Sequence, residues 1–371
     1  MQYTDGQLGV LWVAKGLGPG GMERLLVNHA RCGDRERFRY HAAYLVDRPN
    51  SVIGELEDLG VTCSKLAAHS QLDPRWALEL RRLVAGERID VVHVHSPMVA
   101  AVARPALRAM RHRPKLVYTE HNSWDCYGRA TRWANALTYP LDDAQIAVSG
   151  DAKRSVPKML ARRVEVLTHG IELDSVRGWS EQRAAARAEL GVGESTVVIT
   201  AIANLRFEKA YDVLLAAAAE TLAAHDDVVF LGVGHGQLQN DMNDLHARLG
   251  LGDRFRFLGF RSDALRILAA SDVFTLASRN EGLPVSLMEA SALGLPTVAT
   301  AVGGLVDYVV EGVTGLLVPA ESPHALAEAY GGLIVDRERR ESMGKHAAEA
   351  AAQFDASVAV RRLEAIYAGL V

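Results

Sequence analysis

The stretch LGVLWVAKGLGPGGMERL, Leu8–Leu25, joins an apolar run to a helix-like segment through a glycine-rich turn. Gly16, Gly18 and Gly21 fit the pattern G-x-G-x-x-G, and Asp47 ends the next apolar run, where a ribose-binding acid stands in dinucleotide sites. Backbone N–H groups at such a helix start can approach a phosphate closely. A tight turn required only by chain geometry fits the same motif, so the stretch predicts strand, turn and helix before it predicts a ligand.

The same strand-then-helix order repeats along the chain. Short apolar runs alternate with longer Ala-, Leu- and Arg-rich segments of helical spacing. The runs of the first half are LGVLWVA, YHAAYLV, DVVHVHS, KLVYTEH, QIAVS and RVEVLTHGIEL, and those of the second are TVVITAIAN, VVFLGVG, FRFLGF, VFTLAS, PTVATA and TGLLVP. Buried strands that alternate with helices predict an α/β protein with two doubly wound, Rossmann-like parallel sheets.

A polar, helix-prone segment, SEQRAAARAELGVGES, separates the two series of runs. We therefore expect an N-terminal domain over 1–175, a junction over 176–192 and a C-terminal domain over 193–353. The remaining residues, 354–371, are expected to form a helix that packs back on the N-terminal domain. Ligands of such sheets bind beyond the carboxyl ends of the strands, so the loops after the apolar runs should hold the site.

The composition is that of a globular protein, with 49% hydrophobic and 23% charged residues in a chain of 371, which is too long for one ordinary core. No apolar run reaches the roughly 18–20 residues that span a bilayer, and the start lacks the pattern of a secretory signal. Cys32, Cys63 and Cys126 have no metal-type spacing. These features favour reduced thiols and a cytoplasmic location.

The net charge of −4 divides into +4 for residues 1–175 and −8 for the remainder. A basic half could face an anionic acceptor or a membrane surface, although ordinary surface variation is the favoured interpretation. The segment MRHRPKL, Met110–Leu116, could contact phospholipid, but a solvated helix-to-strand loop is favoured there too.

Two cations follow the first apolar run of the second half, in NLRFEKAYDVLL. Arg206 and Lys209 lie three residues apart at the mouth of the expected strand–helix loop. A guanidinium fork and an ammonium point charge can straddle a diphosphate there. A solvated loop with Glu208 as the partner fits this pattern equally well.

Two glutamates stand eight residues apart in EGLPVSLMEASALG. Pro284 suits the first turn of a helix, which puts Glu281 in the preceding loop and Glu289 a little over one turn inside. The helix start exposes backbone donors at about residues 285–287, and its dipole favours an anion. Like charges repel, so carboxylates on both sides of a phosphate would accept hydrogen bonds from hydroxyls instead. A nucleoside diphosphate sugar has that layout, and two solvated surface glutamates are the alternative.

Together the motifs resemble the retaining glycosyltransferases of family 4. The resemblance rests on GGMER, LRFEKAYDVL, LGVGHGQL, FLGF, the spacing of Glu281 and Glu289, and GGLVDYVVEGVTGLLVP, and it covers nearly the whole chain. It implies the GT-B fold, in which two facing Rossmann-like domains enclose the active site in an interdomain cleft.

The resemblance also implies roles for the matching positions. Glu281 would bind hydroxyls of the sugar and Glu289 the ribose. The other donor-binding positions would contact the diphosphate or border the base: Gly20, Gly21, Arg206, Lys209, Phe260, Arg261, Leu283, Pro284 and Val285. Gly20 and Gly21 would reach the diphosphate from the opposite domain.

Histidines end two apolar runs, in VYTEHNSWD and VVHVHSP. His121 resembles the family's strand-end histidine near the reacting face of the sugar, and His95 resembles a second one that lines the acceptor cleft. A structural role is the alternative for both, because a lone histidine more often has one. Where the family commonly has Asn-Gly, this chain has His169 and Gly170. Gly170 keeps the permissive backbone, whereas any contact of the Asn side chain is in doubt.

The expected reaction moves a hexosyl unit from a nucleoside diphosphate sugar to an acceptor hydroxyl, with retention of anomeric configuration. His121, Glu281, Arg206 and Lys209 are the catalytic candidates, and UDP is favoured over GDP on family frequency. By resemblance, the leaving diphosphate takes the acceptor's proton on the same face. Two cations and a helix dipole would stabilise that leaving group, so neither a metal nor another cofactor is expected, and no nucleic acid partner.

Other functions explain fewer of these residues. A glycoside hydrolase uses two carboxylates but needs no phosphate site. An NAD-dependent dehydrogenase would leave Arg206, Lys209, Glu281 and Glu289 without a role. A sugar-nucleotide epimerase of similar fold remains an alternative, as does a non-catalytic nucleotide-sugar-binding protein, which would not need His121.

Overall fold

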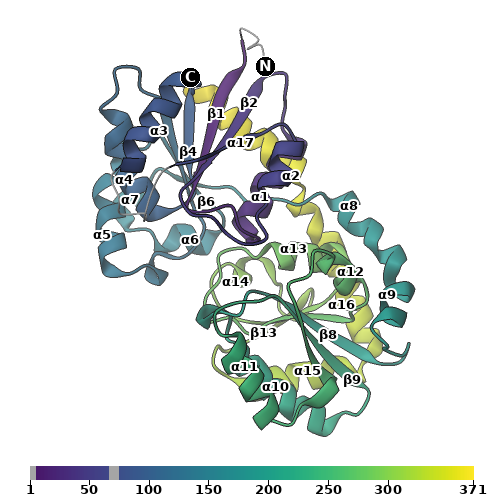
Figure 1. Ribbon diagram of the computed structural model, residues 1–371. Helices are drawn as coiled ribbons and strands as arrows, with labels where there is room; N and C mark the ends of the chain where they lie inside the picture. The colour runs from purple at the N-terminus through teal and green to yellow at the C-terminus, as the bar shows by residue number, and fades with distance from the viewer. Residues whose placement is uncertain (1–5, 67–74) are drawn as a thin grey trace. The chain divides into compact units, whose positions relative to one another are not determined.

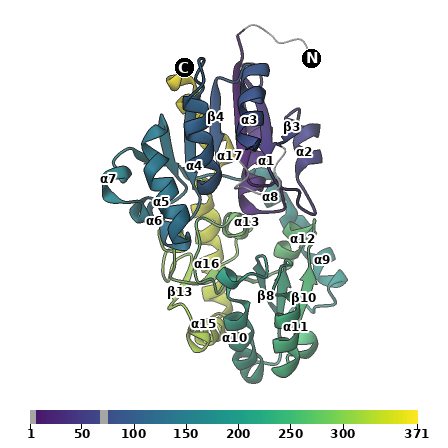
Figure 2. The same cartoon turned by 60° about the vertical axis from the view of Figure 1, so that its left-hand side comes forward.

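The computed structural model of the protein describes residues 6–66 and 75–371. The chain forms two compact units: unit 1 contains the chain up to Gly170 together with Asp355–Val371, and unit 2 is Ile171–Phe354. Figures 1 and 2 show both units in two views.

The described strands of unit 1 form one parallel sheet with the order β3-β2-β1-β4-β5-β6-β7. The strand order reverses between β1 and β4, and ligands of open parallel sheets bind at the carboxyl edge at such a point. Most of its strands are largely buried, which is why they appear in the sequence as continuous apolar runs. The strands are β1 (Leu8–Ala14), β2 (Phe38–Tyr44), β3 (Thr62–Lys65), β4 (Val91–Val94), β5 (Lys115–Glu120), β6 (Ala144–Ala147) and β7 (Val164–Val166).

Helices cover both faces of the unit 1 sheet. Leu26, Leu56 and Leu363 share one core, under α1 (Gly21–Cys32), α2 (Ile53–Asp58) and α17 (Ala356–Leu370). Figure 1 shows α17, in yellow, beside the purple β1 and β2. Trp76 and Val99 belong to the core on the other face. That face is covered by α3 (Arg75–Gly86), α4 (Pro97–Arg108), α5 (Arg129–Thr138), α6 (Gly150–Ser155) and α7 (Lys158–Ala161).

The described strands of unit 2 also form one parallel sheet, with the order β10-β9-β8-β11-β12-β13. Its strand order reverses between β8 and β11, which are hydrogen-bonded neighbours. The strands are β8 (Val197–Ile202), β9 (Val228–Val233), β10 (Phe255–Gly259), β11 (Val273–Leu276), β12 (Thr297–Thr300) and β13 (Gly315–Val318).

The helices of unit 2 likewise lie on both faces of its sheet. Leu214 and Leu326 pack in one core, and Leu268 and Leu287 in another on the opposite face. The helices are α8 (Leu173–Gly178), α9 (Arg183–Glu189), α10 (Tyr211–Ala224), α11 (Gln239–Arg248), α12 (Ala264–Ala269), α13 (Val285–Ala292), α14 (Leu305–Tyr308), α15 (Pro323–Val335) and α16 (Arg337–Ala350).

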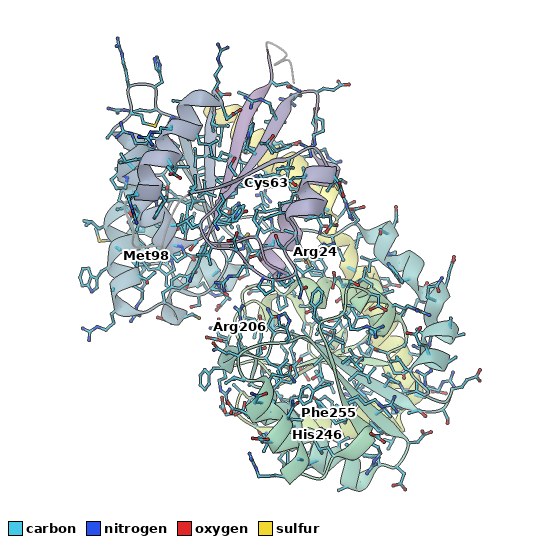
Figure 3. All side chains as sticks on the ribbon, viewed as in Figure 1. Arg24, Cys63, Met98, Arg206, His246 and Phe255 are labelled. Atoms are coloured by element: carbon cyan, nitrogen blue, oxygen red, sulfur yellow. The ribbon has the colours of Figure 1, made fainter. Side chains whose placement is uncertain are left out.

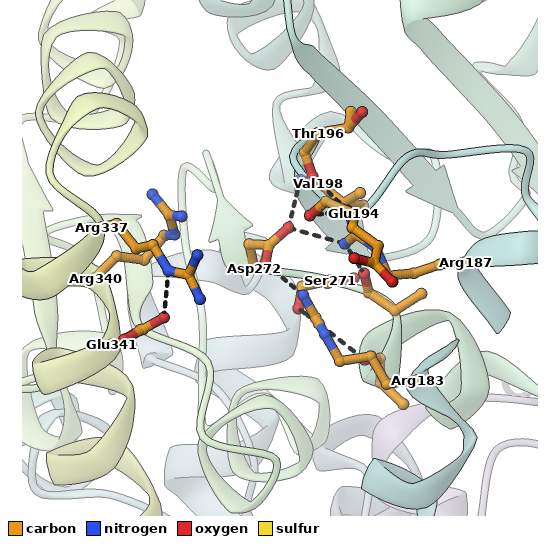
Figure 4. Close-up of polar contacts among 12 residues, drawn as sticks. Arg183, Arg187, Glu194, Thr196, Val198, Ser271, Asp272, Arg337, Arg340 and Glu341 are labelled. Carbon is orange, nitrogen blue, oxygen red and sulfur yellow. Dashed lines mark hydrogen bonds and ion pairs between the residues drawn. The ribbon is translucent and has the colours of Figure 1, made fainter. Parts of the chain in front are cut away.

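Two arginines hold α9, which lies in the segment expected to be the junction, to the sheet of unit 2 (Figure 4). Asp272, just before β11, accepts hydrogen bonds from Arg183 Nη2 at 2.6 Å and from Arg187 Nη1 at 3.1 Å. The backbone N–H of Val198 donates to the same carboxylate at 2.8 Å. These bonds explain why residues 176–192 belong to unit 2 instead of forming a separate linker.

The chain passes from unit 1 to unit 2 after Gly170 and returns after Phe354. Within unit 2, the N–H of Ile171 donates to the carbonyl of Phe354 at 2.8 Å. Within unit 1, a Cβ on Gly170 would overlap the backbone of Ala356 at the start of α17. Gly170 has no positive φ, so close packing requires this glycine and not the permissive backbone suggested by the sequence.

The expected α/β fold with two doubly wound parallel sheets is confirmed. Each apolar run proposed as a strand overlaps one, and β1 has the bounds of its run, Leu8–Ala14. The sequence missed β3, whose four residues, TCSK, form no apolar run. In the described part of the chain, no helix is both long and apolar enough to cross a membrane.

Candidate functional site

Two loops meet at the carboxyl edge of the unit 2 sheet. Residues 203–210 follow β8 and residues 277–284 follow β11, and these strands are neighbours at the point where the strand order reverses. Ligands of open parallel sheets bind at such points. Arg206, Lys209 and Glu281, which are far apart in the sequence, therefore come to the same edge.

Lys209 and Glu281 form a direct ion pair. The Nζ of Lys209 donates to both carboxylate oxygens of Glu281, at 2.6 and 2.7 Å, and the Oγ of Ser278 donates to Oε1 at 2.6 Å. The Glu281 side chain is 6% exposed and that of Lys209 25% exposed. A carboxylate this deeply buried requires partners, and these two donors supply them. The sequence predicted separate tasks for Lys209 and Glu281, whereas the structure joins them in one hydrogen-bonded unit.

A glycine supports Glu281 from the loop after β12. Gly303 has φ 54°, in the left-handed region, and a Cβ there would overlap the carbonyl oxygen of Glu281. The N–H of Gly304 donates to that same carbonyl at 3.2 Å. Only glycine lets the backbone at position 303 come this close to the Glu281 carbonyl, so the loop after β12 fixes the backbone of Glu281.

The helix after Glu281 starts one residue later than the sequence suggested. Pro284 has extended ψ and is the N-cap of α13, which begins at Val285. The N–H of Leu287 donates to the Pro284 carbonyl at 3.1 Å, so the donors of the helix start are those of Val285 and Ser286. Leu283 lies in the loop just before them. Glu289 is the fifth residue of α13, a little over one turn inside the helix as its spacing predicted, and it is half-buried.

Arg206, the other predicted cation, is exposed on the loop that carries Lys209 and takes no part in the pair with Glu281. Figure 3 shows Arg206 at one end of unit 2, with Phe255, at the amino end of β10, toward the other. The long, exposed side chain of Arg206 is therefore available to bind an anion at the carboxyl edge of the sheet.

Sequence reasoning missed Arg279, which ties the two loops together. Its backbone N–H donates to the carbonyl of Glu208 at 2.8 Å, and its Nη1 donates to the carbonyl of Phe207 at 2.7 Å. Its guanidinium also pairs with Asp212 at 2.7 Å, and hydrogen bonding to that carboxylate raises the pKa of Arg279. No pattern in the sequence distinguishes this arginine from a solvated one beside Glu281.

Phe260 and Arg261 lie after β10, at the same edge of the sheet. Arg261 donates to both carboxylate oxygens of Asp263 at 2.7 Å, and this hydrogen bonding raises the pKa of Arg261. Phe260 is exposed, and its ring meets that of His235 edge-on at 5.8 Å between centroids. His235, within the motif LGVGHGQL, was not singled out from the sequence; its ring and that of Phe260 form an aromatic corner.

Gly20 and Gly21 open α1 in unit 1, as the glycine-rich motif predicted. Gly20 is the N-cap and Gly21 the first helical residue. The carboxylate of Glu23 folds back against Gly20, where a Cβ would overlap it. A negative charge is favourable near a helix N-terminus, so Glu23, in the first turn, complements the dipole of α1.

Three histidines gather at the carboxyl edge of the unit 1 sheet. His95 follows β4 and His121 follows β5, and their Nδ1 and Nε2 atoms are hydrogen-bonded at 3.0 Å. The ring of His169 stacks on that of His121, with centroids 5.7 Å apart and planes 11° apart. Burial lowers the pKa of all three, that of His169 to about 4, so each imidazole is neutral near pH 7. His169 thus takes part in the same group of rings as the two predicted histidines.

The group extends inward through two histidines that the sequence analysis did not single out. His93 bonds the hydroxyl of Tyr367 through Nδ1 at 2.6 Å and that of Thr119 through Nε2 at 2.7 Å. His29, on α1, contacts the Tyr40 hydroxyl through Nε2 at 3.1 Å. A cavity of about 20 Å³, roughly the space of one water, lies among the rings. Among the described residues, no group of side chains has the arrangement of a metal site.

A buried carboxylate precedes His121 in the chain. Glu120, at the end of β5, accepts hydrogen bonds from the hydroxyls of Tyr118 at 3.2 Å and of Tyr127. Burial raises the pKa of Glu120 to about 7, so its charge changes near physiological pH. The sequence contained Glu120 within a predicted strand, and nothing in the pattern marked it as buried.

Comparison with protein families covers both units. Residues 19–175 match the family described as Glycosyltransferase Family 4, and residues 182–350 match the family described as Glycosyl transferases group 1. The chain belongs to glycosyltransferase family 4. These two matches confirm the family that the sequence motifs resemble.

Curated relatives of this family 4 protein carry specific names. It is 36% identical over 214 residues to a D-inositol 3-phosphate glycosyltransferase of Corynebacterium aurimucosum, a match covering 55% of this chain and 51% of the relative. It is 26% identical over 296 residues to an N-acetyl-alpha-D-glucosaminyl L-malate synthase of Bacillus anthracis, covering 78% and 77%. The chain thus spans about half the length of the first of these relatives.

Solved structures show the same fold. HepE of Anabaena in complex with UDP-glucose matches with a TM-score of 0.86 at 22% identity, covering 98% of this chain and 100% of that one. WaaG, a glycosyltransferase involved in lipopolysaccharide biosynthesis, matches with a TM-score of 0.74 at 17% identity, covering 97% and 100%. The family 4 protein therefore has the GT-B fold.

Proposed function

We propose that this protein transfers a hexosyl unit from a nucleoside diphosphate sugar to an acceptor hydroxyl, with retention of the anomeric configuration. The observation that carries the proposal is the ion pair of Lys209 with Glu281, at 2.6 Å, directly before the start of α13. It brings a cation, a carboxylate and helix-start N–H donors to one point at the switch point of the unit 2 sheet. A sugar diphosphate needs these three kinds of group.

Each group has a defined task in the proposed donor complex. Arg206, Lys209 and the N–H groups of Val285 and Ser286 bind the diphosphate and stabilise the charge that develops as it leaves. Glu281 accepts hydrogen bonds from sugar hydroxyls, and Lys209 fixes the direction in which its carboxylate points.

The donor's base and ribose would be held farther along the same unit. Glu289, half-buried on α13, accepts from the ribose. Phe260 borders the base with its exposed ring. Because Arg261 is bound to Asp263, we assign it to shaping this border and not to carrying charge to the ligand.

Transfer itself needs no nucleophilic side chain in this proposal. The bond between the anomeric carbon and the diphosphate oxygen breaks, and a bond to the acceptor oxygen forms on the same face. The acceptor's proton passes to the departing diphosphate. His121 and His95 act on the acceptor side, where a neutral imidazole can donate or accept a hydrogen bond without adding charge.

The names of relatives support the substrate classes. HepE of Anabaena has been solved with UDP and with UDP-glucose, which favours UDP over GDP as the nucleotide. The curated relatives are named for inositol 3-phosphate and for L-malate, which favours a small, hydroxyl-bearing anion as the acceptor.

The deciding experiment incubates the protein with a panel of UDP- and GDP-sugars, with and without inositol phosphates and hydroxy acids, and follows the products by mass spectrometry. We expect one donor to be consumed together with one acceptor, and proton NMR of the product to show the donor's anomeric configuration. Inverted product would exclude the retaining mechanism.

The same panel separates the alternatives. An epimerase would change the donor without any acceptor, and a non-catalytic binding protein would leave it intact. Activity should persist in excess EDTA, because side chains and a helix start provide the positive charge. Complete loss of activity that Mg²⁺ or Mn²⁺ restores would refute the metal-free proposal.

A further inference from the structure

One face of α5 in unit 1 carries large apolar side chains into solvent. Arg129, Trp133 and Leu137 recur every fourth residue and so form one stripe along the helix. Trp133 is 75% exposed and Leu137 83% exposed. The other described tryptophans of unit 1, at positions 12, 76 and 124, are at most 3% exposed. Large apolar side chains that are exposed next to one another mark surfaces that contact a membrane or another protein.

The opposite face of α5 fixes this orientation. Asn135 is fully buried, and its Oδ1 accepts a hydrogen bond from Arg104 Nη1 at 2.7 Å. The same Nη1 donates to the hydroxyl of Thr138 at 2.9 Å. Arg104 is itself buried in an ion pair with Asp142 at 2.8 Å. The helix cannot turn its stripe inward without breaking these buried bonds.

A second short helix adds apolar and basic side chains. Met159, on α7, is 91% exposed, and α5 and α7 lie near each other in both Figure 1 and Figure 2. Residues 150–164 contain five Lys or Arg residues and a single acid, Asp151. We define the α5–α7 face by its exposed members: Arg129, Trp133, Leu137, Lys158, Met159, Arg162 and Arg163.

We infer that the α5–α7 face binds the surface of an anionic lipid bilayer. Trp133, Leu137 and Met159 would enter the boundary between headgroups and acyl chains, where tryptophan is favoured. The basic side chains around them would contact the anionic headgroups. This contact is peripheral, in keeping with the absence of a spanning helix among the described residues.

The composition of the face favours lipid over a second copy of the chain. A two-fold dimer places the same patch on both partners, so it would bring Arg129, Lys158, Arg162 and Arg163 against their own copies. Three apolar side chains are also few for a stable protein interface, which buries about 800 Å² on each partner. A fluid anionic surface needs no matching shape and neutralises all the cations at once.

The face also differs from the basic segment noted in the sequence. Met110–Leu116 follows α4, before β5, at the amino edge of the unit 1 sheet. Arg129, by contrast, starts the helix that follows β5 and so lies near the carboxyl edge, the edge of His95 and His121. Arg162 and Arg163 come just before β7 and so lie near the amino edge, which means that the α5–α7 face extends from one edge of the sheet to the other.

The test is co-sedimentation with vesicles of phosphatidylcholine alone or mixed with phosphatidylglycerol. We expect binding to the anionic vesicles, a blue shift of tryptophan fluorescence and weaker binding as salt rises. Equal binding to both vesicles, or none to the anionic ones, would overturn the inference. Vesicle binding is measured without a sugar donor. The membrane inference can therefore be refuted while the proposed transferase activity is confirmed, and the transferase activity can be refuted while vesicle binding is confirmed.

Two variants locate the surface. Trp133→Ala/Leu137→Ala/Met159→Ala should weaken binding at least tenfold, as should Arg162→Glu/Arg163→Glu, since one basic residue contributes about fivefold. Val335→Ala, which changes an equally exposed apolar residue on α15 of unit 2, should bind like the wild type.

Unchanged vesicle binding by the triple variant would refute the assignment to this face. Thermal melting confirms that the variants are folded. Sedimentation velocity without lipid tests the competing occupant, because a wild-type dimer that the triple variant abolishes would make the face a protein interface.

Discussion

Replacing Lys209 should destabilise unit 2 as well as impair donor binding. In the structure its Nζ contacts both oxygens of the Glu281 carboxylate, at 2.6 and 2.7 Å, and that side chain is only 6% exposed. Lys209→Met keeps the length of the side chain and removes its charge. Glu281 would then retain Ser278 as a donor, with no cation to offset its burial.

The expected magnitudes form a double-mutant cycle. Removing one partner of a buried ion pair costs about 3–5 kcal/mol, and Lys209→Met should lie at the lower end because Lys209 is one-quarter exposed. Glu281→Gln should cost about 1 kcal/mol, since the amide still accepts from Ser278 and the ammonium group can turn to water. The double variant should cost about 2 kcal/mol, so the two residues are coupled by about 2 kcal/mol.

The assay is urea unfolding, with hydrogen exchange of α10 and α13 assigning the change to unit 2. Arg206→Met is the matched control, because it removes an exposed cation from the same loop and should change stability by less than about 0.5 kcal/mol. Two outcomes would show that the pair does not neutralise a buried charge. In one, the losses of unfolding free energy in Lys209→Met and Glu281→Gln add up to that of the double variant. In the other, Lys209→Met is as stable as the control.

Three further predictions address binding and pH. Arg206→Ala should lower kcat/KM about ten- to a hundredfold with unfolding unchanged, because it removes a charge-assisted hydrogen bond to the leaving group; wild-type kinetics would remove Arg206 from the site. Calorimetry with bare nucleoside diphosphate should show weaker binding in Glu289→Ala and nearly intact binding in Glu281→Ala, whereas transfer should fall steeply in Glu281→Ala; the reverse order would contradict the two placements. Burial lowers the pKa of His169 from 6.5 to about 4, so between these pH values the unfolded chain takes up a proton at His169 and the folded chain does not. The free energy of unfolding should therefore keep its full value above pH 6.5 and fall by about 1.4 kcal/mol per pH unit as the pH falls toward 4. Urea unfolding followed by tryptophan fluorescence should therefore be less pH-dependent between 6.5 and 4 in His169→Asn, and an unchanged slope would show that His169 takes up a proton in the folded state.

Strand positions could be predicted because buried parallel strands are continuous apolar runs. The run Leu8–Ala14 is β1 itself, whereas TCSK, Thr62–Lys65, escaped notice because it is an outer strand with mostly polar residues. The sequence also predicted that Lys209 and Glu281 lie at the same edge of one sheet, because each follows an apolar run. It could not predict their hydrogen bond, which depends on side-chain directions across two loops and on the support of Gly303.

The histidine group was the part of the site that could least be predicted from the sequence. His29, His93, His95, His121 and His169 come from four strands or loops and a helix, and no spacing relates them along the chain. Their neutral state follows from burial, which the sequence does not encode position by position. Gly170 shows the same limit, because its close neighbour Ala356 is far away in sequence.

The return of α17 to unit 1 has a consequence for biosynthesis. A ribosome makes all of unit 2 after the body of unit 1 and before α17, whose Leu363 and Tyr367 fill the core between α1 and β1. While unit 2 is being translated, that apolar face of unit 1 stays uncovered, and His93 lacks the hydroxyl of Tyr367. Unit 2 can close as soon as Phe354 emerges, so the half of the protein that is started first is finished last. A nascent chain stalled before α17 would therefore expose the apolar face of unit 1 to chaperones and proteases.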